Sequence, residues 1–230
     1  MELYSEHFKV MKIIFDNFSD LILRWHKKNR KNFEWRETCE AYKILISEIF
    51  LHKTDSKKVE KVYPKFIERY PTVYDLYKAE DGEINSIFKE IGLFYRGKRL
   101  KKIAEQIVSS FEGNVPNRKE DLISLYGVGD YISNAVLCFA FKKKVPIVDT
   151  NIIRIYDRVF GIKSSKSRPR TDKKIWYFAE KVLPENNYVE YNYSLLDFAS
   201  EICKAKKPLC DICSVKDVCE YEKEKDKDDS

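Results

Sequence analysis

Apolar residues recur every three to four positions along most of this chain, the spacing that places them on one face of a helix. Val59, Val62, Phe66 and Ile67 are a clear example. Only seven glycines and seven prolines interrupt the 230 residues, so the connections between helices should be short. No stretch shows the alternation that marks strands, and the pattern predicts an all-α protein. The predicted helices cover residues 6–28, 40–53, 56–70, 73–79, 83–91, 97–112, 118–124, 130–142, 150–160, 171–182 and 189–202.

The charge balance changes this picture only slightly. Lys and Arg total 43 and Asp and Glu total 37, a net charge of +6 that is compatible with nucleic-acid binding but does not establish it. The highly charged end, residues 223–230, is predicted to be disordered. The basic segment 161–171 is predicted to be either a flexible connection or a loop that contacts phosphates. No segment has the pattern of a membrane span or a signal peptide, so we expect a cytoplasmic protein.

Four of the six cysteines fall in one segment near the end of the chain, CKAKKPLCDICSVKDVC. They are spaced C-x6-C-x2-C-x5-C and are Cys203, Cys210, Cys213 and Cys219. In a reducing compartment such clustered cysteines are better explained as metal ligands than as disulfides. Zinc and iron-sulfur clusters both accept four thiolates, so the residue types alone do not choose between them.

A short glycine turn, Gly127-Val128-Gly129, separates two predicted helices. Glycines permit a left-handed turn and leave backbone N–H groups exposed where the next helix begins, a setting that favours an anion. A DNA phosphate fits there without any charged side chain. Such turns also join helices in many proteins that bind no phosphate.

Two carboxylates stand in unusual positions. Asp149 directly precedes the helical segment TNIIRIYDRVFG and is predicted to cap it. Glu48 has Ile44, Leu45 and Leu51 on its own helical face. Burial there would favour the protonated acid, which a general acid near neutral pH requires. The alternative is that Glu48 reaches solvent at the edge of the helix.

Over residues 33–222 the chain resembles the endonuclease III/MutY branch of the helix-hairpin-helix (HhH-GPD) DNA glycosylases, and most closely the archaeal-type thymine-mismatch (Mig-like) members. The cysteine spacing is similar to that family's [4Fe–4S] site, and the resemblance implies this cluster in place of zinc. Residues 122–141 resemble the family's hairpin, with Tyr126 where a proline is usual. The segment EWRETCEAYKILISEIFLHKT, residues 34–54, looks like the signature that carries a catalytic glutamate at Glu48.

The resemblance also implies roles for single residues. Asp149 would be the catalytic carboxylate as well as a cap, and Glu48 would assist proton delivery or water placement. Bifunctional members carry a nucleophilic lysine where this chain has Tyr131, which implies a monofunctional enzyme without lyase activity, although Tyr131 could also be a core residue. The implied phosphate contacts are Gly127, Val128, Gly129, Lys204, Lys206 and Lys207. The residues implied to fill the space left by a flipped base are His52, Lys53, Phe94 and Tyr95.

Two departures from the adenine glycosylases point to the substrate. His52-Lys53 replaces a pair of glutamines, and Tyr193 stands where those enzymes read adenine with a glutamine. In addition, the domain that those enzymes use for oxidised guanine is not recognised in this sequence. The resemblance therefore implies excision of thymine or uracil opposite guanine in mismatched or damaged double-stranded DNA. One alternative is an adenine glycosylase acting opposite guanine or oxidised guanine. Others are a non-catalytic helix-hairpin-helix DNA-binding protein, which would not need Glu48 and Asp149 together, and a zinc-stapled structural protein, which would not need the hairpin.

We expect two helical domains that flank a DNA-binding cleft. Residues 41–144 would form a six-helix domain with Glu48 and the hairpin, and residues 1–40 plus 145–222 would form the cluster domain with Asp149. The protein is expected to be a monomer in the cytoplasm of a prokaryote, associated with the nucleoid when bound to DNA, and to have no contact with membranes.

Overall fold

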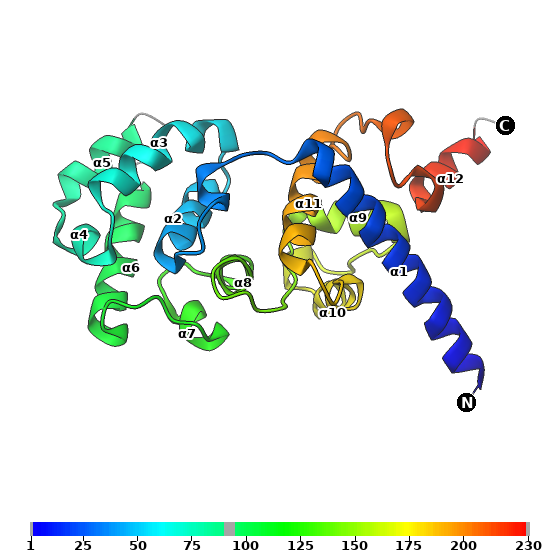
Figure 1. Cartoon of the computed structure of the whole chain (residues 1–230), viewed down its shortest axis with the longest axis horizontal. Helices are drawn as coiled ribbons and strands as arrows, with labels where there is room; N and C mark the ends of the chain where they lie inside the picture. Colours follow the sequence, from blue (N-terminus) through cyan, green and yellow to red (C-terminus); the bar gives the residue numbers. More distant parts are fainter. Residues whose placement is uncertain (1, 90–94, 229–230) are drawn as a thin grey trace. The chain divides into compact units, whose positions relative to one another are not determined.

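The computed structural model describes residues 2–89 and 95–228, with side chains described for residues 12–88 and 96–224. Within these ranges all regular structure is helical, which confirms the predicted fold class (Figure 1). The α-helices are α1 (Glu2–Asn29), α2 (Ala41–Leu51), α3 (Ser56–Arg69), α4 (Val73–Lys78), α5 (Asp81–Lys89), α6 (Tyr95–Phe111), α7 (Lys119–Ser124), α8 (Asp130–Phe139), α9 (Thr150–Phe160), α10 (Lys173–Val182), α11 (Tyr188–Glu201) and α12 (Glu220–Asp228). Single turns of 3₁₀ helix are η1 (Glu34–Arg36), η2 (Pro169–Thr171), η3 (Cys210–Ile212) and η4 (Lys216–Val218).

Each helix predicted from the apolar spacing is present as one of α1 to α11, with ends that differ by a few residues. The helix predicted over 130–142 ends earlier, because Lys142 adopts a left-handed backbone with φ of 51°. None of the described helices is both long and apolar enough to cross a bilayer.

The chain divides into two compact units, one formed by Asn32–Lys143 and the other by Met1–Lys31 together with Lys144–Ser230. The first unit therefore begins before the predicted boundary at residue 41. The reason is the packing of η1 against α2: Trp35 is buried, stacks on Phe33 with ring centroids 4.5 Å apart, and meets the edge of Tyr63 at 5.5 Å.

The unit Asn32–Lys143 is built around α2. This helix packs against α3, α6 and α8, and every residue from Ile44 to Phe50 is buried. Phe50 meets the rings of Phe66 and Phe88 edge to face, each at a centroid distance of 5.0 Å. Burying an aromatic ring of this kind contributes about 1.5–3 kcal/mol. The core thus surrounds the helix that carries Glu48.

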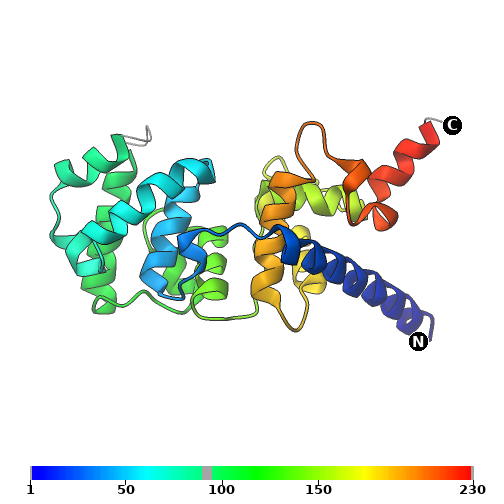
Figure 2. The same ribbon diagram turned by 45° about the horizontal axis from the view of Figure 1, so that its top comes forward.

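The other unit pairs α1 with α10 and α11, and α9 with α11 and α12 (Figure 2). Phe18 of α1 contacts Phe160 at a centroid distance of 4.9 Å, and both rings lie in an aromatic cluster with Phe178. The buried His26 is 3.1 Å from a carboxylate oxygen of Asp197, which ties α1 to α11 by a polar contact. This packing holds α9, the helix that follows Asp149.

Residues 223–230 were predicted to be disordered, but α12 is helical through Asp228 and packs on α9. The Arg158 guanidinium lies over the ring of Tyr221 at 5.2 Å, and the buried Glu222 is 3.6 Å from Nζ of Lys216. These contacts anchor the first turn of the helix. The basic segment 161–171 is also held by a hydrogen bond, since the Ser164 hydroxyl donates at 2.7 Å to Asp172, the residue that caps α10.

Candidate active site

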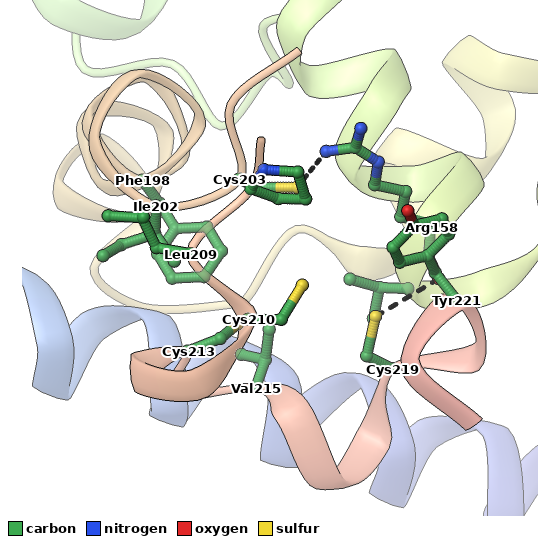
Figure 3. Close-up of a pocket in the computed structure, with 12 residues that line it drawn as sticks. Arg158, Phe198, Ile202, Cys203, Leu209, Cys210, Cys213, Val215, Cys219 and Tyr221 are labelled. Atoms are coloured by element: carbon green, nitrogen blue, oxygen red, sulfur yellow. Dashed lines mark hydrogen bonds between the residues drawn. The ribbon is translucent and has the colours of Figure 1, made fainter. Parts of the chain in front are cut away.

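Four thiols surround one hollow beyond the end of α11. Cys203, Cys210, Cys213 and Cys219 line it together with apolar side chains that include Phe198 and Leu209 (Figure 3). The hollow measures about 310 Å³ including its open mouth. The short turns η3 and η4 place the last three cysteines around it. The predicted ligands, spread over seventeen residues of sequence, therefore face a common space.

The chemistry of this hollow fits an iron-sulfur cluster. Burial raises the pKa of Cys213 to about 11, an effect to which the neighbouring Cys219 and Cys203 add, and burial also raises the pKa of Cys219. Thiols in such surroundings become thiolates when a bound metal supplies compensating positive charge. Nη1 of Arg158 donates to Sγ of Cys203 at 3.5 Å, a hydrogen bond of the type that cluster ligands accept. In the described part of the chain, no three cysteine, histidine or acidic side chains are grouped closely enough to hold a single metal ion.

Asp149 lies at the start of α9, and the structure confirms that it caps this helix. Its Oδ1 accepts hydrogen bonds from the backbone N–H groups of Asn151 and Ile152, both at 2.8 Å. Its Oδ2 accepts a third, from Nδ2 of Asn151, also at 2.8 Å. The carboxylate is half-buried and held from two sides, so its orientation is well defined. Its catalytic role stays a prediction.

Arginines on α9 connect Asp149 to the cysteine loop. Nη1 of Arg154 donates to Oδ1 of Asn151 at 2.9 Å, and Nε of Arg154 donates to the carbonyl of Cys203 at 2.9 Å. Arg158 donates to the carbonyl of Lys204 at 2.7 Å. Neither arginine was assigned a role from the sequence. Their signal was the spacing of Asn151, Arg154 and Arg158, which places all three on one face of α9.

The side chain of Asn192 on α11 shapes the segment that leads to Asp149. Its Oδ1 accepts from the N–H of Ile147 at 3.2 Å, and its Nδ2 donates to the carbonyl of Val145 at 3.1 Å. Tyr193, the next residue, is buried. Whether Tyr193 lines a base pocket stays a prediction.

Glu48, Tyr131 and the glycine turn belong to the unit Asn32–Lys143. Glu48 lies in the last turn of α2 and is 3% exposed, so the alternative in which it reaches solvent is wrong. Tyr131 is the second residue of α8 and is half-buried. The structure therefore provides a buried acid on one helix and a phenol near the beginning of another.

Only one of the two hairpin glycines needs to be glycine for its backbone conformation. Gly127 has φ of 73°, and a Cβ there would lie 2.9 Å from Nε of Arg99. Gly129 is extended, with φ of −112°, and a Cβ would meet nothing within 4 Å. Val128 is buried between them and anchors the turn, its N–H donating to the carbonyl of Leu125 at 3.0 Å. The expectation that both glycines serve a left-handed turn holds for Gly127 alone.

The other residues predicted to contact DNA differ in their exposure. His52 is half-buried directly after α2, and Lys53 is exposed with a left-handed backbone, φ of 59°. Phe94 lies outside the described residues, and so does the side chain of Tyr95. Of the three lysines between the first two cysteines, Lys204 is half-buried and the other two, Lys206 and Lys207, are exposed. Their contacts with DNA stay predictions.

Comparison with known proteins decides the family. Residues 46–181 match the model of the HhH-GPD superfamily of base excision DNA repair proteins. The chain belongs to the HhH-GPD superfamily. Its residues 203–219 also match the iron-sulfur binding domain of endonuclease III, a range that starts and ends at cysteines of the loop. These matches confirm the predicted family, its [4Fe–4S] cofactor and DNA as the partner.

Two relatives cover this HhH-GPD chain almost completely. It is 38% identical to the thymine/uracil-DNA glycosylase of Pyrobaculum aerophilum, over 90% of this chain and 92% of that protein. It is also 38% identical to the thymine-DNA glycosylase of Aeropyrum pernix, over 87% of this chain and 92% of that protein. An adenine DNA glycosylase of Buchnera aphidicola is 32% identical, over 90% of this chain and 60% of that protein.

Solved structures agree with this assignment. A thermostable thymine-DNA glycosylase superposes with a TM-score of 0.88 at 35% identity, over 93% of this chain and 99% of the other. Endonuclease III in a trapped covalent complex with DNA superposes with a TM-score of 0.76 at 22% identity, over 90% of this chain and 94% of the other, which shows the shared fold.

Proposed function

We propose that this protein is a monofunctional DNA glycosylase that excises uracil or thymine opposite guanine. The observation that carries the proposal is its identity of 38%, over nearly the whole length of both chains, to glycosylases that are named for these two bases. In this reaction the bond between the base and C1′ of the sugar breaks, the base leaves with a proton, and water adds a hydroxyl group to C1′. The protein would act as a monomer on the chromosomal DNA of a prokaryotic cell.

Asp149 is the residue proposed to stabilise the positive charge that develops on the sugar as the base departs. Three hydrogen-bond donors hold its carboxylate before the reaction begins, so little reorganisation is needed in the transition state. Glu48, buried in the last turn of α2, is proposed to deliver the proton or to place the water. Each role requires a carboxyl group whose position is set by the fold.

Tyr131 supports the monofunctional assignment. A lysine at the second position of α8 could attack C1′ and form an imine, whereas a phenol cannot. We therefore propose that the product is an intact abasic site. Cys203, Cys210, Cys213 and Cys219 would hold the cluster, whose proposed contribution when bound is to fix the loop that carries the lysines.

The proposed choice of a pyrimidine rests on two departures from the adenine enzymes. Tyr193 is bulky and stands where those enzymes have an adenine-reading glutamine, and a pyrimidine needs a smaller pocket than adenine. His52 and Lys53 replace a glutamine pair on the turn after α2. Both changes remove amide groups suited to pairing with adenine.

The test is single-turnover excision on matched duplexes that contain G·U, G·T, G·A or oxidised-G·A, followed by alkali to reveal abasic sites. We expect rapid cleavage at uracil and thymine and little at adenine. Faster removal of adenine than of either pyrimidine would favour the adenine glycosylase, the one competing function that the 32% identical relative supports. Binding without excision on every duplex would favour the non-catalytic protein.

A further inference from the structure

Arg96, at the start of α6, places its guanidinium at the end of α2 and is fully buried. A buried charge is costly unless hydrogen bonds replace its water. Its Nη1 donates to the carbonyl of Ile49 at 3.0 Å and to that of Phe50. Its Nη2 donates to the carbonyl of His52 and, at 2.8 Å, to the Thr54 hydroxyl. All four acceptors come from one short stretch of chain, residues 49–54.

These bonds complete the end of α2. The last four carbonyls of a helix have no partner within it. Here the carbonyls of residues 48 and 51 accept from the N–H groups of His52 and Thr54, at 3.2 Å and 3.0 Å. The two carbonyls between them accept from Arg96. The positive charge also lies at the negative end of the α2 dipole, where a cation is stabilising.

The turn that closes around the guanidinium contains Lys53. Arg96 holds both sides of this residue, the carbonyl before it and the hydroxyl after it. Between these two groups Lys53 has a left-handed backbone conformation, which residues other than glycine rarely adopt, and its side chain is exposed. The buried arginine thus defines the conformation from which His52 and Lys53 project.

We infer that Arg96 is a positioning residue that shapes the His52–Lys53 turn for filling the space left by the flipped base. The inference rests on the proposed function and on the predicted role of His52 and Lys53 in filling the space that the flipped base leaves. Arg96 acts through the turn, and its effect should appear in the opening of the base pair rather than in the cleavage of the glycosidic bond.

The test compares a paired substrate with one whose target base is already unpaired. Arg96→Lys keeps the positive charge but lacks the planar guanidinium that reaches all four acceptors. We expect it to slow single-turnover excision of uracil from a G·U duplex by about 10-fold or more, because small misplacements cost that much. With uracil in a short bubble, its rate should stay within about twofold of wild type. Equal losses on both substrates, or none on either, would overturn the inference.

A fluorescent reporter gives a second readout. The fluorescence of 2-aminopurine placed beside the target base should increase less on binding of Arg96→Lys than on binding of wild type. An equal increase in fluorescence would overturn the inference. This readout also applies if wild type does not excise uracil from the bubble. If Arg96→Lys does not fold, Thr54→Val removes one acceptor and should act in the same direction. In a Lys53→Ala background, Arg96→Lys should add little, since both act through one turn.

Two controls separate this role from general stability and from the function itself. Leu100→Ala, at a fully buried position on the same helix, destabilises α6 without removing a hydrogen bond to the turn, and it should slow excision equally on paired and bubble DNA. A selective defect in Leu100→Ala would show that loss of stability alone explains the effect. Wild type that excises uracil from neither substrate would contradict the proposed function rather than the role of Arg96.

Discussion

The guanidinium of Arg154 donates hydrogen bonds both to the carbonyl of Cys203, the first cysteine of the cluster loop, and to Asn151, the residue that donates to Asp149. The distances are 2.9 Å from Nε to the carbonyl and 2.9 Å from Nη1 to Oδ1 of Asn151. Asn151 in turn donates to Asp149 at 2.8 Å. A continuous path of hydrogen bonds therefore joins the cysteine loop to the proposed catalytic carboxylate.

Asn151→Ala should lower excision without loss of iron. It removes one of three donors to Asp149, so the carboxylate can turn away from the sugar, and we expect single-turnover excision to fall by about 10-fold. The exposed Asn117 provides a matched control, since Asn117→Ala should leave the rate unchanged. Iron content and excision are measured on the same preparations. A variant with full activity would show that the third hydrogen bond does not position Asp149.

Asp149→Asn should abolish excision and leave the fold and the binding of mismatched DNA intact. Asparagine also caps helices, so α9 keeps its start, while the negative charge that stabilises the transition state is lost. We expect the rate to fall by at least about 10²-fold. Asp172→Asn changes the cap of α10 in the same way and should keep full activity. Comparable losses in the two variants would assign the effect to capping instead of catalysis.

Borohydride should trap no covalent adduct between wild-type protein and DNA, because Tyr131 offers no amine to C1′. Tyr131→Lys is expected to gain a trapped adduct, and Tyr131→Phe to gain none. The adduct is measured as a shifted band on a denaturing gel. A strong wild-type adduct would mean that another lysine attacks the sugar, and the monofunctional assignment would fail.

The two hairpin glycines should respond differently to alanine. Gly127→Ala forces a left-handed alanine, which costs about 1–2 kcal/mol, and thermal unfolding should reveal the loss. Gly129→Ala adds a methyl group in open space on extended backbone, so stability should change by less than about 0.5 kcal/mol.

If a phosphate approaches the N–H groups at the start of α8, the Gly129 methyl should still weaken binding. The expected loss for a duplex with an abasic analogue is about 1.5 kcal/mol, or about tenfold in Kd, the value of one hydrogen bond to a charged group. Unchanged affinity in a stable Gly129→Ala variant would place the phosphate elsewhere.

The helices were predictable from sequence because apolar spacing along a helix is a local property. Val59 and Phe66 mark the buried face of α3 without any knowledge of what covers it. The cap at Asp149 was predictable for the same reason, since its donors are two and three residues away. The cysteine spacing indicated a metal site because all four ligands lie in one short segment, and the resemblance to the family implied a [4Fe–4S] cluster in place of zinc.

Other features depend on partners that are distant in sequence. The burial of Glu48 is decided by the helices that enclose α2. The need for glycine at position 127 is decided by the turn and by Arg99, which lies 28 residues earlier. Arg96 and Arg154 look like ordinary surface arginines until the backbone carbonyls that accept from them, more than 40 residues away, are in place. Hydrogen bonds and burial depend on which atoms meet, and only the packed chain brings these together.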